Sequence, residues 1–206
     1  QNIILGNLNF SLTKDQIKSL KEINEDLSSS NKMFRLLQGD VGSGKTIVAL
    51  ISSLNVISSK FQVALMAPTE ILARQHYELA KKLFPKNINI ELLSSKSAVS
   101  EKKMIIKELT NNKIDMVFGT HAIFQKKINF ANLGYIIIDE QHKFGVRQRK
   151  LLSDKGGDNC DVLLMSATPI PRTLTMSVYG DMDVSIIKEK PSNRKSVKTY
   201  SKLENK

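Results

Sequence analysis

The segment GDVGSGKT, residues 39–46, constrains this chain more than any other stretch. It fits the pattern G-x-x-x-x-G-K-[ST], follows the apolar run FRLLQ and precedes an apolar helical pattern, which is the context that this motif needs. The glycines let the backbone curl so that its N–H groups face one side, and the following helix adds the positive end of its dipole. We therefore predict a phosphate-binding loop rather than an ordinary glycine-rich turn, formed by Gly39, Asp40, Val41, Gly42, Ser43, Gly44, Lys45 and Thr46.

Short apolar runs alternate with helical patterns along most of the chain. The apolar runs are FRLLQ, FQVALMAP, NINIELL, IDMVFGT, LGYIIIDE, CDVLLMSAT and DVSII. Helical patterns lie at about residues 46–58, 70–83, 99–110 and 172–179, with a further segment after Phe144. Apolar strands that alternate with helices are typical of a parallel sheet covered on both faces. The predicted fold class is therefore α/β, a doubly wound, mainly parallel sheet.

The chain divides into three predicted parts. Residues 1–12 lack a clear period and are expected to be an incoming linker, and residues 190–206 are polar, basic and without an apolar face, as in an outgoing linker. Residues 13–189 form the domain. Thr13 is a plausible N-cap for a first helix that runs to about Leu27, with Ile17, Leu20 and Ile23 on its apolar face. Because the chain begins with Gln1 rather than Met, we expect it to be a piece of a longer protein.

The net charge and the cysteine content indicate which kind of partner and which cellular setting to expect. The chain has 31 basic and 20 acidic residues and a net charge of +11, which suggests a polyanionic partner, nucleic acid first and an anionic membrane second. A merely lysine-rich surface explains the charge alone about equally well. Its single cysteine, Cys160, excludes an intrachain disulfide and fits a reducing, cytoplasmic setting. Cys160 begins an apolar strand, so a catalytic thiol is not expected. No signal peptide or membrane-spanning apolar run is visible, so we expect no membrane partner.

The run YIIIDE supplies the second half of a nucleotide site. A buried strand that ends in Asp139 and Glu140 places two carboxylates at the carboxyl edge of the sheet, where ligands bind in such folds. Asp139 can hold Mg²⁺, usually through water, and Glu140 can orient or deprotonate an attacking water. Such a run alone is a weak signal, but beside a phosphate loop with Lys45 for phosphate and Thr46 for Mg²⁺ it predicts a nucleoside triphosphate hydrolase.

The run SATP, residues 166–169, follows another buried strand. The hydroxyls of Ser166 and Thr168 are expected to bond to the Asp139–Glu140 loop and to link the nucleotide to neighbouring segments. The alternative is a capped strand-to-helix turn, punctuated by Pro169 and Pro171. The sequence of this turn alone favours the alternative.

Five blocks occur in the order seen in superfamily 2 helicases: GDVGSGKT, PTEILARQH, GTHAIF, DEQHKFGVRQR and SATPIPRTLTMSVYGDMDVSII. From about Phe10 to Ile187 the chain resembles the RecG family, bacterial ATP-dependent DNA helicases that remodel stalled forks and branched recombination intermediates such as Holliday junctions. The nearest rival is the transcription-repair coupling factor, which shares two of the blocks but typically has Glu where this chain has Gln141.

The resemblance implies a RecA-like P-loop motor lobe that uses ATP and Mg²⁺. It implies that Gln16 faces the base, that Lys45, Asp139 and Glu140 are catalytic, and that Thr46 and Asp139 hold the metal. It implies a set of residues that couple ATP hydrolysis to DNA binding and sense the other motor lobe. This coupling set is Gln141, His142, Ser166 and Thr168. It also places backbone contacts to DNA at Pro68, Thr69, Arg74, Gly119, Thr120 and His121, and, in place of the family's usual Thr-Gly pair, at Ser94 and Lys96.

The resemblance also implies parts that are not in this sequence. A RecG-type enzyme carries a wedge domain for branched DNA and a second motor lobe, whose arginines stabilise charge on the transferring phosphate. Arg147, Arg149 and Arg172 are not expected to replace them. This lobe alone is therefore expected to bind ATP–Mg²⁺ weakly and to be nearly inactive. A nucleotide-dependent DNA-binding module without motor activity is an open alternative, and a small-molecule kinase ranks last.

Overall fold

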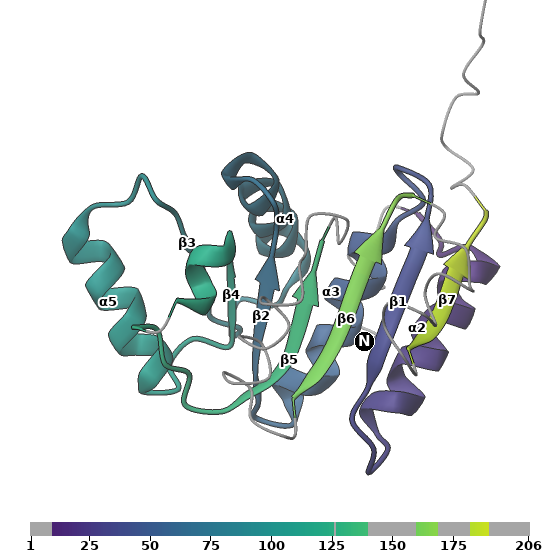
Figure 1. Ribbon diagram of the computed structural model, residues 1–206, viewed down its shortest axis with the longest axis horizontal. Coiled ribbons are helices and arrows are strands. Elements are labelled where there is room, and N and C mark those ends of the chain that lie inside the picture. The colour runs from purple at the N-terminus through teal and green to yellow at the C-terminus, as the bar shows by residue number, and fades with distance from the viewer. Residues whose placement is uncertain (1–9, 126, 140–159, 169–181, 190–206) are drawn as a thin grey trace, which may run out of the picture.

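The computed structural model describes residues 10–125, 127–139, 160–168 and 182–189. Strands in these ranges form one seven-stranded sheet in the order β3-β4-β2-β5-β6-β1-β7 (Figure 1). All six pairings between neighbours are parallel, so the carboxyl ends of all the strands lie at one edge. The strands are β1 (Phe34–Gly39), β2 (Gln62–Met66), β3 (Ile90–Leu93), β4 (Met116–Gly119), β5 (Leu133–Ile138), β6 (Asp161–Ser166) and β7 (Asp183–Ile187).

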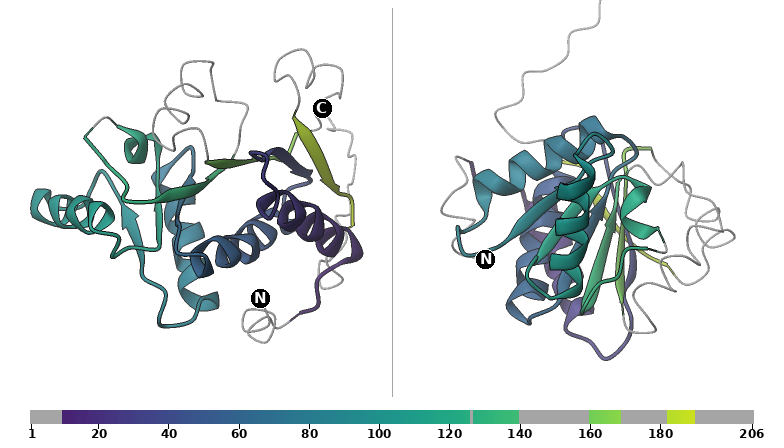
Figure 2. Two further views of the ribbon diagram at one scale, coloured as in Figure 1. Left: turned by 90° about the horizontal axis from the view of Figure 1, so that it is seen from below. Right: turned by 90° about the vertical axis from the view of Figure 1, so that its left-hand side faces the viewer.

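Both faces of this sheet are buried. Successive strand residues point to opposite faces, so Leu36 and Leu37 of β1 are both buried but belong to different core clusters. One cluster lies under α2 (Lys14–Leu27), α3 (Lys45–Ser58) and α4 (Glu70–Leu83). The other includes residues of α5 (Val99–Thr110) and of the short helix η1 (His121–Phe124). Seen from below, α2 and α3 lie on one side of the strands and η1 on the other (Figure 2, left).

The predicted parallel α/β architecture is confirmed. Each of the seven apolar runs contains one strand, and helices α4 and α5 have the predicted bounds. The predicted helical segments after Phe144 and at 172–179, the linker at 190–206 and residues 1–9 of the incoming linker lie outside the described residues. Of the remaining predicted linker, Leu12 packs against the core. No helix in the described ranges combines the length and the apolar character that a membrane span requires.

The predicted apolar face of the first helix is wrong at one position. Ile17 is 55% exposed, whereas the residues that α2 buries are Gln16, Ser19, Leu20 and Ile23. Thr13 caps the helix as predicted, and it forms a capping box with Gln16. The Gln16 amide Nε2 also donates to the carbonyl of Ser43 at 2.7 Å, which turns residue 16 inward and residue 17 outward.

Cys160 is buried just before β6. Burial, helped by the nearby carboxylate of Asp161, raises the pKa of this thiol to about 12. The thiol therefore stays protonated at neutral pH, as expected of a structural cysteine.

A buried guanidinium fastens the last turns of α2 to the sheet near the amino end of β1. Arg35 of β1 is 8% exposed, and its Nε donates to Asp26 Oδ2 at 2.7 Å while its Nη1 donates to Ser185 Oγ at 3.0 Å. Glu22 Oε2 lies 3.7 Å from the same Nη1. Helix α2 and strands β1 and β7 thus share one ionic network.

We predict that Arg35→Ala lowers the free energy of unfolding by about 3–5 kcal/mol, because it leaves partly buried carboxylates without their partner. Urea denaturation followed by circular dichroism measures the change. The exposed pair Lys21–Glu25 on α2 provides the control, since Lys21→Ala should change stability by less than about 0.5 kcal/mol. Equal stability of Arg35→Ala and wild type would show that the network does not hold α2 in place.

Candidate functional site

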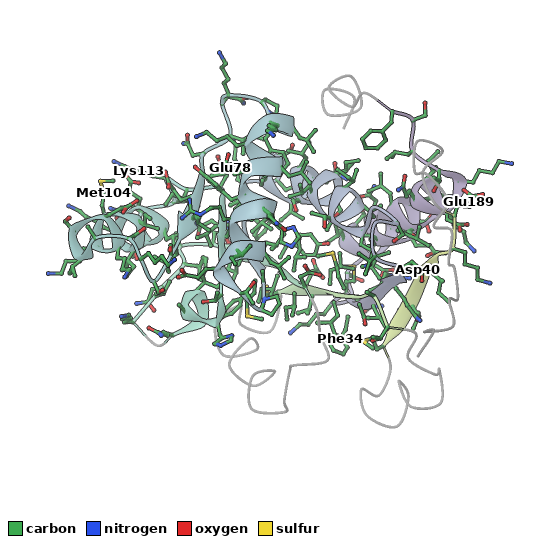
Figure 3. The ribbon with its side chains drawn as sticks, turned by 90° about the horizontal axis from the view of Figure 1, so that it is seen from above. Phe34, Asp40, Glu78, Met104, Lys113 and Glu189 are labelled. Carbon is green, nitrogen blue, oxygen red and sulfur yellow. The ribbon has the colours of Figure 1, made fainter. Side chains whose placement is uncertain are left out.

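The loop after β1 has a backbone conformation that strongly favours glycine at two positions. Gly42 and Gly44 have φ angles of 78° and 89°. A Cβ on Gly44 would lie 2.2 Å from the amide nitrogen of Gln16, and one on Gly39 would lie 2.6 Å from Ser43 Oγ. The loop is therefore closed tightly on itself and on α2. Viewed onto the carboxyl edge, Asp40 of this loop lies toward the β7 side of the sheet and Glu78 lies on α4 (Figure 3).

Polar groups in the loop fit a phosphate. Lys45 Nζ donates to the carbonyls of Gly39 at 2.6 Å and Asp40 at 3.1 Å, so the ammonium lies over the loop. Ser43 Oγ is buried and has no hydrogen-bond partner among the described residues. A buried hydroxyl without a partner is costly, and an oxyanion in the loop would satisfy it.

A pocket of about 490 Å³ opens beside this loop. Its lining includes the predicted residues Gln16, Lys45, Thr46 and Asp139, and also Phe10, which the sequence analysis missed. Phe10 is 39% exposed, so its ring offers a flat apolar surface at the side of this pocket. The signal that could have found it is a lone aromatic residue three positions before the helix cap Thr13.

The predicted metal ligand Asp139 follows β5 and is buried against α4. Its Oδ2 lies 2.7 Å from Nε2 of His76, which is also buried. The sequence analysis did not single out His76. The signal was a histidine within a stripe of buried α4 residues, namely Ala73, His76, Ala80 and Leu83.

The predicted catalytic residue Glu140 and the predicted coupling residues Gln141 and His142 lie outside the described residues. Ser166 Oγ bonds to the hydroxyl and carbonyl of Thr168 and accepts from Thr168 N–H, as in the capped turn that the sequence of this segment alone favours. The expected bonds to the Asp139–Glu140 loop stay a prediction. The turn satisfies its own polar groups locally, as serine and threonine at strand ends often do. Ala167, between them, lines the nucleotide pocket.

The predicted DNA-contacting segments meet at the carboxyl ends of three neighbouring strands. Pro68 and Thr69 follow β2, and Ser94 and Lys96 follow β3. Gly119 ends β4, and Thr120 and His121 follow it. The carbonyl of Gly119 accepts from Ala67 N–H at 2.9 Å. A Cβ on Gly119 would lie 2.5 Å from Ile123 Cγ2 and 3.0 Å from the Leu93 carbonyl, so glycine is needed for this close approach.

Glu70 joins two of these segments, and the sequence analysis missed it. Its carboxylate accepts from the hydroxyl of Ser94 at 3.2 Å and from the N–H of Ser95. Hydrogen bonds from Ser95 are the main reason that the pKa of Glu70 lies below its usual range. The loop after β3 is thereby held against the first turn of α4. A groove of about 530 Å³ lies there, lined by Glu70, Ile71, Arg74, Gln75, Glu78, Leu79, Lys82 and Lys96.

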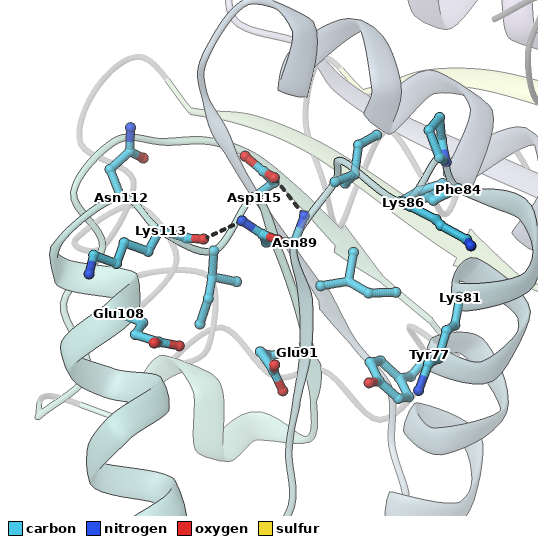
Figure 4. A pocket seen from close by; sticks show the side chains of 14 residues that line it. Tyr77, Lys81, Phe84, Lys86, Asn89, Glu91, Glu108, Asn112, Lys113 and Asp115 are labelled. Carbon is cyan, nitrogen blue, oxygen red and sulfur yellow. Dashed lines mark hydrogen bonds between the residues drawn. The ribbon is translucent and has the colours of Figure 1, made fainter.

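A larger groove of about 740 Å³ lies elsewhere (Figure 4). It is formed by residues that precede β3 and β4, such as Asn89 and Asp115, and by the carboxyl ends of α4 and α5. It is therefore at the amino edge of the sheet, opposite the phosphate loop. Burial, together with the neighbouring Glu108, raises the pKa of Glu91 in this groove.

A phosphate loop between β1 and α3 on an all-parallel, doubly covered sheet defines a RecA-like P-loop domain. The chain matches the family model described as DEAD/DEAH box helicase over residues 13–177, and it belongs to that family.

The chain is similar to curated proteins named ATP-dependent DNA helicase RecG. It is 55% identical over 194 residues to the protein of Aquifex aeolicus, covering 93% of this chain and 24% of the relative. It is 50% identical over 198 residues to that of Borreliella burgdorferi, covering 96% and 29%. The chain thus spans about a quarter of the length of these relatives.

Two solved helicase structures are also similar to this chain. A structure of RecG bound to a three-way DNA junction is 45% identical, with a TM-score of 0.81, over 94% of this chain and 26% of that one. The DEAD-box helicase Mss116 bound to ssRNA and UDP-BeF is 22% identical, with a TM-score of 0.69, over 90% of this chain and 42% of that one. The second likeness concerns the fold alone.

We predict that Gly44→Ala destabilises the protein by more than the backbone strain of an alanine at positive φ, which is about 1–2 kcal/mol. The added Cβ would displace the Gln16 amide and break its bond to Ser43. In a Gln16→Ala background, where that amide is absent, the cost of Gly44→Ala should fall to the strain alone. Urea unfolding of wild type, of each single variant and of the double variant measures the cost of Gly44→Ala in both backgrounds. Equal costs in the two backgrounds would show that α2 and the loop are not coupled through Gln16.

Proposed function

We propose that this chain is the first motor lobe of a RecG-type DNA helicase, which couples ATP hydrolysis to movement on branched DNA in recombination and repair. The supporting observation is that the phosphate loop, Asp139 and the three predicted DNA-contacting segments lie at one edge of a single rigid sheet. The identity of about 50% to RecG proteins supports the RecG type. In this proposal residues 13–189 are the lobe, and residues 1–12 and 190–206 are linkers.

The nucleotide site is proposed to hold ATP and Mg²⁺. The Lys45 ammonium, which now bonds to two loop carbonyls, would exchange them for oxygens of the β- and γ-phosphates. Thr46 and Asp139 would hold Mg²⁺, with Asp139 acting through water, and the metal would neutralise charge on the phosphates. Glu140 would orient and deprotonate the attacking water. Gln16 and Phe10 line the same pocket and would contact the base.

The DNA site is proposed to read the backbone rather than the bases. Helix α4 begins at the cap Thr69, so the positive end of its dipole lies at the carboxyl edge, and the groove along its side contains Arg74 and Lys96. Pro68, Gly119, Thr120 and His121 would add contacts, and Ser94 would hold the loop that carries Lys96. Contacts of this kind are independent of sequence, as a motor that tracks a strand requires. RecG itself has been solved on a three-way junction, so branched duplex DNA is the proposed partner.

Coupling would connect the two sites through β5 and β6, which are neighbours in the sheet. Gln141, His142, Ser166 and Thr168 are proposed to sense the nucleotide and a second RecA-like lobe. That lobe would supply the arginines that stabilise the transferring phosphate, worth about 10³–10⁵ in rate in related NTPases. A wedge domain is the further proposed partner, and a cytoplasmic location follows from this function.

We predict that this chain hydrolyses ATP at a negligible rate with or without forked duplex DNA, because half of the cleft belongs to the second lobe. It should nevertheless bind a fluorescent ATP analogue, and Lys45→Ala should abolish that binding. Steady-state phosphate release and a binding titration measure the two quantities. Turnover that forked DNA stimulates and that depends on Lys45 would show that the lobe, alone or as a pair of copies, already has a complete site.

We predict that forked-DNA binding weakens linearly in a plot of log affinity against log salt. Arg74→Ala and Lys96→Ala should each reduce the slope by about 1, as expected for the loss of one phosphate contact. Fluorescence anisotropy at several salt concentrations measures the slope. The control is Lys113→Ala, which removes a lysine from the groove at the opposite edge and should leave the slope unchanged. A larger effect of Lys113→Ala would place the DNA on the amino edge.

A further inference from the structure

A buried polar contact joins helix α4 to the end of β5. His76 Nε2 lies 2.7 Å from Asp139 Oδ2, and the two side chains are only 10% and 11% exposed. A carboxylate accepts hydrogen bonds, so the proton of this contact lies on Nε2 of the imidazole. Hydrogen bonds to a charged group in such a poorly hydrated place are short and directional. The contact therefore fixes how the Asp139 carboxylate is turned.

Packing alone does not require a histidine at this position. Residue 76 lies in the buried stripe of α4 with Ala73, Ala80 and Leu83, where an apolar side chain would pack without a desolvation cost. The imidazole is satisfied there by the carboxylate of Asp139. Polar groups that hold the ligands of a metal are placed in this way, and their loss typically costs about 10–100-fold in metal affinity.

The same helix borders the predicted DNA groove. Its cap Thr69 belongs to the segment after β2, and its first residue Glu70 holds the segment after β3. Arg74 lines the groove about half a turn before His76. An α-helix moves as a stiff rod, so a shift of its first turn also moves His76. The orientation of Asp139 is thereby linked to the position of the groove.

We propose that His76 is a positioning residue: it orients Asp139 toward Mg²⁺ and makes that orientation depend on where DNA holds α4. The inference rests on the proposed function, in which Asp139 serves the metal and α4 serves the DNA. Linkage is reciprocal, so DNA that improves the metal site through His76 is itself bound more tightly when Mg²⁺ and nucleotide are present.

The test is a titration of Mg²⁺ in the presence of mant-ATP, with and without forked duplex DNA. Wild type should need less Mg²⁺ for half-maximal binding when DNA is present, by about 5-fold or more. His76→Leu should raise the Mg²⁺ requirement by about 10–100-fold and lose the DNA effect, while mant-ATP affinity in EDTA stays unchanged. A merely structural role would instead change the affinity in EDTA as well.

Two further variants sharpen the comparison. His76→Gln places an amide nitrogen near the position of Nε2 and should restore most of the Mg²⁺ response. Lys81→Ala removes an exposed lysine from the last turn of the same helix and should behave as wild type. A Gln variant as defective as the Leu variant would overturn the hydrogen-bond explanation.

The outcomes for the proposed function and for this inference are distinct. If wild type binds mant-ATP without any dependence on Mg²⁺, the proposed metal site itself is wrong. If wild type depends on Mg²⁺ and His76→Leu behaves identically, the role of His76 alone is wrong.

If the Leu variant does not fold, the ¹⁵N NMR signal of His76 Nε2 in the wild-type protein tests the inference instead. It should shift on adding Mg²⁺ with mant-ATP and again on adding DNA, and an unmoved signal would overturn the inference.

Discussion

Parallel pairing throughout the sheet is the constraint on which the rest of the structure depends. Because each neighbour runs in the same direction, seven strands deliver their carboxyl ends to one edge. Residues far apart in sequence, such as Lys45, Asp139 and Arg74, are thereby gathered at that edge. Burial of both faces makes the sheet stiff, since its strands pack between two apolar clusters. The loops at that edge can therefore hold polar groups in a strained or buried arrangement.

Much of this arrangement could be predicted from the sequence because the signals are local. The phosphate loop needs glycines at fixed spacing, and α4 and α5 have clear periods with flanking breaks, so their bounds were predicted correctly. The positions that escaped prediction depend on contacts between distant segments. Ile17 is exposed because Gln16 is drawn to the phosphate loop, and Glu70 matters because a loop some 24 residues later bonds to it. Neither contact leaves a periodic trace in the chain.

His76 and Ser166 differ in how far away in the sequence their partners lie. The buried stripe of α4 predicts that residue 76 faces the core, but not that a carboxylate meets it 63 residues later. The hydroxyl of Ser166 bonds to Thr168 two residues away, as in the capped turn that the sequence of this segment favours. A nearby partner has a lower entropy cost than a distant one, so a local bond wins unless burial removes the choice. At His76 burial does remove that choice.

The end of β7 shows how the scaffold ties the chain to the nucleotide pocket. Asp15 accepts hydrogen bonds from Lys188 N–H at 2.8 Å and Glu189 N–H at 2.9 Å, and these bonds lower the pKa of its carboxyl. Glu189 lies beside α2 in the view onto the carboxyl edge (Figure 3). Asp15 is next to Gln16, which holds the phosphate loop through Ser43. The first turn of α2 thus bonds to the loop on one side and to the chain at residues 188–189 on the other. Two consecutive residues of α2 therefore connect the phosphate loop with the end of β7.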